Sequence, residues 1–191
     1  IDKVLEFMEE VGDGAATIMI KTDQEPSIQC LGDDLVAARE EGRTVVEESP
    51  VQSSGSNGIV ERAVHTIEGR MRAILIALKE RIGEEVLPTE PVAQFIPECA
   101  AYVNHRLEVG KDGKTATERI KGERSAVPGL EFGEKLPWKI PKKKKKAKMK
   151  QRRAYGIFLG VRRKSGEVWV ACENGEVRKV RAVRRIPFEE R

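Results

Sequence analysis

Apolar residues recur at every third or fourth position in several stretches of the chain, which predicts amphipathic helices. Two of these stretches cover residues 3–11 and 26–41, and each ends at a glycine. The longest stretch follows a polar loop over 49–58. Its apolar stripe consists of Val60, Val64, Ile67, Met71, Ile74 or Leu75, Leu78 and Ile82. A stripe of this length on one face predicts a long helix that packs against a core.

Short apolar runs lie between these helices. Residues 15–21 are mostly apolar and predict a strand buried on both faces, and residues 44–46 predict a second strand. Alternation of helices and apolar strands is typical of an α/β layer. A further helix is expected over 89–107. It should kink or break at Pro97, because proline cannot donate the helical hydrogen bond.

The C-terminal part has a different pattern. Short β-type segments cover 155–161, 167–172, 176–180 and 183–188, and turn residues separate them. This spacing predicts a small barrel or a compact antiparallel sheet. A lysine-rich run over 141–153 precedes these segments.

The composition excludes several classes of protein. The chain has 191 residues, of which 39% are hydrophobic, so a core can form. No stretch approaches the roughly 18 apolar residues of a membrane helix, and no signal peptide is evident. These two observations predict an intracellular protein, nuclear or cytoplasmic, with no membrane partner. Three isolated cysteines predict neither a disulfide framework nor a zinc site. The chain begins without Met, which indicates a fragment or a processed product.

Charge divides the chain into two parts. Residues 136–191 carry 19 Lys and Arg against 5 Asp and Glu, whereas residues 1–135 carry 16 against 26. This asymmetry predicts a tail that binds a polyanion, attached to an acidic body. An acidic body is a poor surface for DNA unless metal ions neutralise part of it.

Two carboxylates stand at positions where an α/β fold gathers functional groups. Asp23 follows the first predicted strand, and Glu61 lies in the first turn of the long helix. They can meet at one edge of the sheet. Structural roles also explain both residues, because Asp often makes a turn after a strand and Glu interacts favourably with a helix dipole.

The context of these carboxylates resembles a known family. The polar loop ends in Asn57-Gly58-Ile59-Val60-Glu61-Arg62, which resembles the loop and helix start of retroviral-type integrases, and especially of copia-type retrotransposon integrases. Thr22-Asp23-Gln24 resembles the motif with the second catalytic Asp of that family, and His65-Thr66 stands where copia-type sequences often have Arg-Thr. Segments 115–122, 132–133 and 155–160 resemble the parts of the family that follow its catalytic core.

The resemblance implies an α/β fold with a partial RNase H-like integrase core, followed by a small all-β SH3-like barrel. The core would cover residues 1–107, a connecting segment 108–140, a lysine-rich linker 141–153 and the basic barrel 154–191. The implied activity is DNA integration by strand transfer. The implied partners are the DNA of the element ends and of the target, in an assembly that is a homo-oligomer in the intact parent.

The implied chemistry uses two divalent cations held by three acidic residues, with Asp23 and Glu61 as two of these catalytic and metal-binding groups. Paired cations serve an in-line attack on a phosphodiester, because one activates the attacking oxygen and the other stabilises the leaving oxygen. Carboxylate oxygens favour Mg²⁺ or Mn²⁺.

The chain also departs from the family. The first catalytic Asp of the family would lie upstream of residue 1, so we expect this chain to be a truncated copy that is inactive alone, and the strand at 15–21 to have an unpaired edge. The family's zinc module is absent, and Glu25 replaces a usual glycine. Whether the chain is an enzyme stays open. The alternative is a non-catalytic nucleic-acid-binding protein from a decayed element.

The lysine run has three interpretations: a solvated linker, a nuclear-localisation patch and a phosphate contact. Beside a small basic β domain, we favour nucleic-acid contact without base specificity, because lysines bind phosphate as point charges. We expect Trp138 and Trp169 to be core residues rather than stacking platforms. The nucleic-acid-binding residues expected here are Arg62, His65, Lys142, Lys143, Lys144, Lys145, Lys146, Lys148, Lys150, Arg152 and Arg153.

Overall fold

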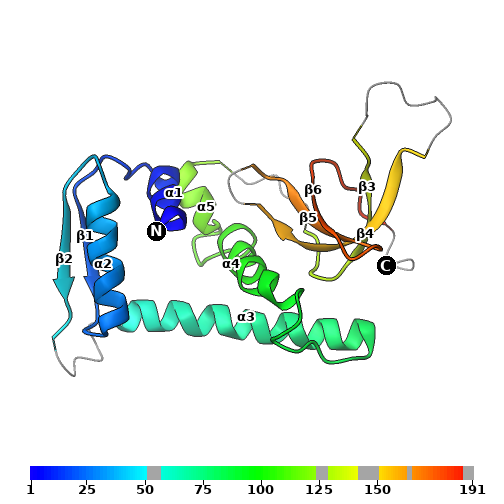
Figure 1. Ribbon diagram of the computed structural model, residues 1–191, viewed down its shortest axis with the longest axis horizontal. Coiled ribbons are helices and arrows are strands. Elements are labelled where there is room, and N and C mark those ends of the chain that lie inside the picture. The colour runs from blue at the N-terminus through cyan, green and yellow to red at the C-terminus, as the bar shows by residue number, and fades with distance from the viewer. Residues whose placement is uncertain (51–56, 124–128, 142–150, 163–164, 187–191) are drawn as a thin grey trace. The chain divides into compact units, whose positions relative to one another are not determined.

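The computed structural model of the chain describes residues 1–50, 57–123, 129–141, 151–162 and 165–186. These residues form a mixed α/β structure that ends in an antiparallel sheet (Figure 1). The chain divides into two compact units, residues 1–65 and 66–191, and the division falls inside the longest helix. No described helix is long and apolar enough to cross a membrane.

The first unit is built from a short helix and a strand–helix–strand segment. Helix α1 (Asp2–Val11) precedes strand β1 (Ile18–Thr22), helix α2 (Pro26–Ala38) and strand β2 (Thr44–Glu48). The two strands are parallel, in a register that runs from Ile18 opposite Thr44 to Thr22 opposite Glu48. Because α2 connects two parallel strands, the predicted α/β layer is confirmed.

The expectation that the first strand is buried on both faces is wrong. The strand also begins later, at Ile18, and Met19 in its middle is 66% exposed. The reason is that α2 covers one face of the two-stranded sheet, where Gly32 lies against the side chain of Val46. The predicted unpaired edge is confirmed among the described residues, since β2 is the one strand that pairs with β1.

Among the described residues, three α-helices and a 3₁₀ turn follow the polar loop. Helix α3 (Gly58–Ile82) is the predicted long helix, and a 3₁₀ turn over Ala93–Phe95 leads into α4 (Ile96–Arg106). The predicted break at Pro97 is confirmed, because α4 begins at Ile96 and places this proline in its first turn, where no backbone donor is needed. Helix α5 (Ala116–Lys121) begins with a capping box formed by Thr115 and Glu118.

Four strands form the antiparallel sheet: β3 (Lys135–Lys139), β4 (Arg153–Val161), β5 (Val168–Cys172) and β6 (Val177–Val180). The last three match predicted segments. Strand β3 was not predicted, and it lies within the segment that the sequence analysis describes as connecting. It pairs with β4 along its whole length.

The chain after β6 returns to the other edge of β3. The amide of Lys139 donates to the carbonyl of Ala182, and the amide of Arg184 donates to the carbonyl of Pro137. Both edges of β3 are therefore hydrogen-bonded, which is consistent with the predicted small barrel or compact antiparallel sheet.

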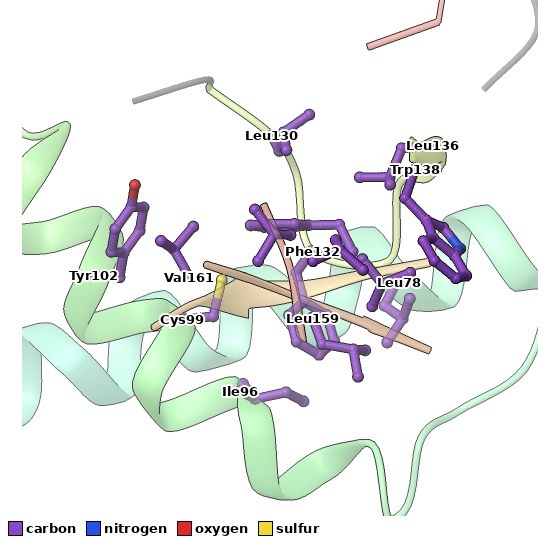
Figure 2. Packing of buried hydrophobic residues seen from close by; sticks show 14 of the residues in the cluster. Leu78, Ile96, Cys99, Tyr102, Leu130, Phe132, Leu136, Trp138, Leu159 and Val161 are labelled. Carbon is purple, nitrogen blue, oxygen red and sulfur yellow. The ribbon is translucent and has the colours of Figure 1, made fainter. Parts of the chain in front are cut away.

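The core of the second unit joins this sheet to two helices. Leu78 of α3 and Ile96 and Cys99 of α4 pack against the inner face of the sheet (Figure 2). Trp138 is 4% exposed and belongs to this core, as predicted. Trp169 is partly buried and packs against the core beside Phe95, so it lies at the margin of the core. The remaining members of the cluster are Val86, Tyr102, Leu130, Phe132, Leu136, Phe158, Leu159, Val161, Val168, Val170 and Val180.

Candidate functional site

Asp23 and Glu61 occupy the positions that the sequence analysis gives them. Asp23 follows the last residue of β1, and Glu61 lies in the first turn of α3. Both side chains are exposed. The carboxylate of Asp23 accepts a weak hydrogen bond, 3.4 Å long, from the amide of Glu25, which closes a turn before α2.

A chain of hydrogen bonds links the end of β1 to the start of α3. The amide of Ser49, which follows β2, donates to the carbonyl of Thr22 over 2.8 Å. The side chains of Ser49 and Asn57 are hydrogen-bonded over 2.7 Å. The amide of Glu61 then donates to the carbonyl of Asn57 over 3.0 Å. This connection holds the first turn of α3 at the carboxyl ends of the two parallel strands.

Burial and sequence position explain why this connection forms. Ser49 is 3% exposed, so its hydroxyl requires a partner inside the structure, and Asn57 supplies one. Gln24 adds a longer contact of 3.4 Å to the carbonyl of Ser49. Ser49 and Asn57 thus have a structural role in placing the helix that carries Glu61.

Asp23 and Glu61 are exposed carboxylates, and two carboxylates alone offer few ligands for a metal ion. Within the described residues there is no group of three or more His, Cys, Asp and Glu side chains able to hold a metal ion. Mg²⁺ nevertheless retains several waters and often binds through one or two carboxylates together with substrate phosphates. The donor chemistry of Asp23 and Glu61 therefore fits a cation shared with a bound nucleic acid. Glu25 is engaged by the hydroxyl of Ser27 over 2.6 Å.

The residues expected to bind nucleic acid lie in different parts of the chain. Arg62 and His65 are exposed on the first turns of α3. The expected lysines over 142–150 lie outside the described residues. Arg152 and Arg153 are described and exposed at the start of β4, beside β3.

A pocket of about 780 Å³ opens at this end of the sheet, and sequence reasoning did not predict it. Its lining comprises Pro137, Gln151, Arg152, Arg153, Tyr155, Arg184, Arg185 and Ile186. Half of these residues are arginines, although Arg184 and Arg185 are absent from the residues expected to bind nucleic acid. The signal for them in the sequence is a third pair of adjacent arginines in the same basic region, after 152–153 and 162–163.

Comparisons with known proteins give little further information. No protein-family model matches the chain, and no curated protein matches it. Among solved structures, it is similar to a chain in the cryo-EM structure of the simian T-cell lymphotropic virus intasome in complex with PP2A regulatory subunit B56 gamma, at 14% identity and a TM-score of 0.41. The similarity covers 96% of this chain and 62% of that chain. A likeness this distant does not establish a family.

Proposed function

We propose that the chain is an integrase-type protein of the copia class, which contributes two metal-binding carboxylates and a basic nucleic-acid-binding part to DNA integration. In this proposal the first unit is a partial RNase H-like core, and the antiparallel sheet is an SH3-like barrel. The partner is DNA, and the complete assembly is a homo-oligomer.

The observation that carries the catalytic part is the hydrogen-bonded connection from Thr22 through Ser49 and Asn57 to Glu61. It joins two motifs that lie 38 positions apart and that both belong to the family-like pattern. If Asp23 and Glu61 had structural roles alone, the two motifs would not need to lie at the same end of the strands. Their meeting there therefore supports the proposal.

The residues would act as follows. Asp23 and Glu61 would hold Mg²⁺ or Mn²⁺, and a pair of such ions would activate an oxygen nucleophile and stabilise the leaving oxygen of a phosphodiester. Ser49 and Asn57 would position the helix that carries Glu61. A third carboxylate is needed to complete the set of ligands that the family pattern implies, so this chain alone should not perform strand transfer.

The test is Mn²⁺ binding, measured by electron paramagnetic resonance on the whole chain in the presence of a DNA duplex. We expect Asp23→Asn and Glu61→Gln each to weaken binding at least about tenfold, because the loss of even an outer-shell partner of a metal ligand costs about 10–100-fold in affinity. Glu47→Gln is the matched control, because Glu47 is an exposed carboxylate on β2 that pairs with Lys21. Equal binding by all four proteins would refute the metal site.

The alternative function is nucleic-acid binding without catalysis, and the arginine-lined pocket favours it. The same experiment separates the two functions. Loss of Mn²⁺ binding in the Asp23 and Glu61 variants supports the integrase proposal. DNA binding without any Mn²⁺ binding that depends on these two residues supports the alternative.

A further inference from the structure

Because side chains alternate between the two faces of a strand, several basic residues of β3 and β4 lie together on the outer face of the sheet. Lys135, Pro137 and Lys139 share one face of β3, because side chains alternate along a strand. Their register partners on β4, Ile157, Tyr155 and Arg153, lie on the same face. The alternate residues Leu136 and Trp138 point into the core.

The segment after β6 supplies the other wall of the pocket. The hydrogen bond from the amide of Arg184 to the carbonyl of Pro137 is 3.1 Å long and holds this segment against β3. Pro137 is buried and therefore forms the floor, between Tyr155 on one side and Arg184 on the other. The pocket thus combines residues that are 47 positions apart in the sequence.

An ion pair between the buried carboxylate of Glu134 and the exposed guanidinium of Arg185 fixes this wall. Glu134 is 1% exposed, and its carboxylate accepts hydrogen bonds of 3.0 and 3.3 Å from the guanidinium of Arg185. One oxygen of the same carboxylate also accepts from the amide of Glu131 over 3.0 Å. The charge of Arg185 is therefore compensated, and the pair anchors the chain segment on which Arg184 is carried.

The other three arginines have no such compensation. Arg152, Arg153 and Arg184 are exposed, and no carboxylate pairs with them among the residues that the structure describes. Three uncompensated guanidinium groups around one pocket favour an anion, and their planar donors match the oxygens of a phosphate group.

We propose that this pocket is a phosphate-binding site in which Arg152, Arg153 and Arg184 contact the phosphate oxygens. The proposal rests on the nucleic-acid-binding part of the proposed function and locates it on named residues. The same chemistry can come from a phosphodiester of a nucleic acid or from a free phosphate, so the test has an arm for each.

The first arm measures binding of the whole chain to a fluorescent DNA duplex over a range of salt concentrations, with EDTA present. Each phosphate contact contributes about 0.9 to the slope of log affinity against log salt for B-DNA. The double variant Arg152→Gln/Arg184→Gln should therefore flatten the slope by about 1.8. The same relation gives about 60-fold weaker binding at 0.1 M salt, for two unrelated duplexes alike.

The control variant removes two arginines from the same unit outside the pocket. Arg162→Gln/Arg181→Gln has the same change in net charge, and the side chain of Arg181 is 87% exposed beside Glu167. We expect this control to retain the slope of the unmodified chain. If the two double variants lose affinity and slope equally, net charge alone drives binding and the pocket is not a site. Thermal unfolding checks that both remain folded, since all four side chains are exposed.

The second arm uses inorganic pyrophosphate in calorimetric titrations. If the pocket variant loses pyrophosphate binding and the control variant keeps it, the phosphate site is supported. If the pocket variant then still binds the duplex with unchanged affinity, the natural ligand is a free phosphate compound rather than a nucleic acid. No difference between the variants in either arm overturns the proposal. Because EDTA removes divalent cations, failure of the metal site at Asp23 and Glu61 leaves these results unaffected, so the two proposals can fail separately.

Discussion

Gly156 lies where β4 crosses the most tightly packed part of the second unit. A Cβ atom at this position would overlap Cγ1 of Val170 and would lie 2.7 Å from the carbonyl oxygen of Ala171. It would also approach Nε1 of Trp138 to 3.4 Å. Val170 is 0% exposed and the carbonyl belongs to the backbone of β5, so neither neighbour can move away freely. We therefore expect Gly156→Ala to destabilise the unit.

The magnitude follows from the cost of overpacking. Inserting a methyl group into a packed core costs about 1–3 kcal/mol, and contact with both a buried side chain and a strand backbone places this case near about 3 kcal/mol. For a chain of this length, 1 kcal/mol lowers Tm by about 2–4 °C, so we expect a decrease of about 6–12 °C. Trp138 and Trp169 are both in the second unit, and their fluorescence reports its unfolding specifically.

Gly129→Ala is the matched control in the same unit. No atom lies within 4 Å of the Cβ position at Gly129, so this substitution should change the stability by less than about 0.5 kcal/mol. If Gly156→Ala unfolds at the temperature of the unmodified chain, the close approach of β4 and β5 at this residue is wrong.

Three further substitutions test other parts of the second unit. Thr115→Ala should lower the free energy of unfolding by about 1 kcal/mol in urea titrations, because it removes the capping box of α5. Glu134→Gln should lower it by about 1–3 kcal/mol, because the charged partner of Arg185 is lost, and a smaller change measured by the same titration would show that the pair does not anchor the segment. Burial, with a smaller contribution from a neighbouring carboxylate, raises the pKa of Cys99 to about 11 from an ordinary value of 9.0. The native state therefore keeps this proton above pH 9 while the unfolded state loses it, so stability should fall between about pH 9 and 11, and Cys99→Ala should reduce this fall. At pH 8, iodoacetamide should modify the exposed Cys30 in the native protein and Cys99 only after unfolding, as mass spectrometry would show.

The elements that could be predicted from sequence are those with strong local signals. The apolar stripe of α3 repeats over seven turns, so its period is clear without knowledge of the partner surface. Pro97 predicts the break before α4 because the restriction on its backbone is local. Asp23 and Glu61 are candidates because their neighbours form short motifs, and the hydrogen bonds through Ser49 and Asn57 involve residues of those motifs.

The features that could not be predicted depend on contacts between distant residues. Strand β3 contains Pro137, which argues against a strand, and it forms because both β4 and the segment at 182–184 supply hydrogen-bonding partners. The exposure of Met19 depends on whether one face or both faces of the sheet are covered. An apolar run in the sequence does not reveal this number. The arginine-lined pocket depends on the return of Arg184 to β3, so no sequence spacing indicates it.

The charge asymmetry of the sequence also separates the two units of the structure. Residues 1–65 carry 5 Lys and Arg against 14 Asp and Glu, whereas residues 66–191 carry 30 against 17. The unit with the two candidate metal ligands is therefore strongly acidic and repels a polyanion, and the unit with the arginine pocket attracts one. Under the proposed function, the basic unit supplies the affinity for DNA, and the acidic unit can approach a phosphodiester only when cations at Asp23 and Glu61 offset its charge. Metal ions should thus have little effect on DNA binding through the pocket, while any contact of DNA with the first unit should depend on them.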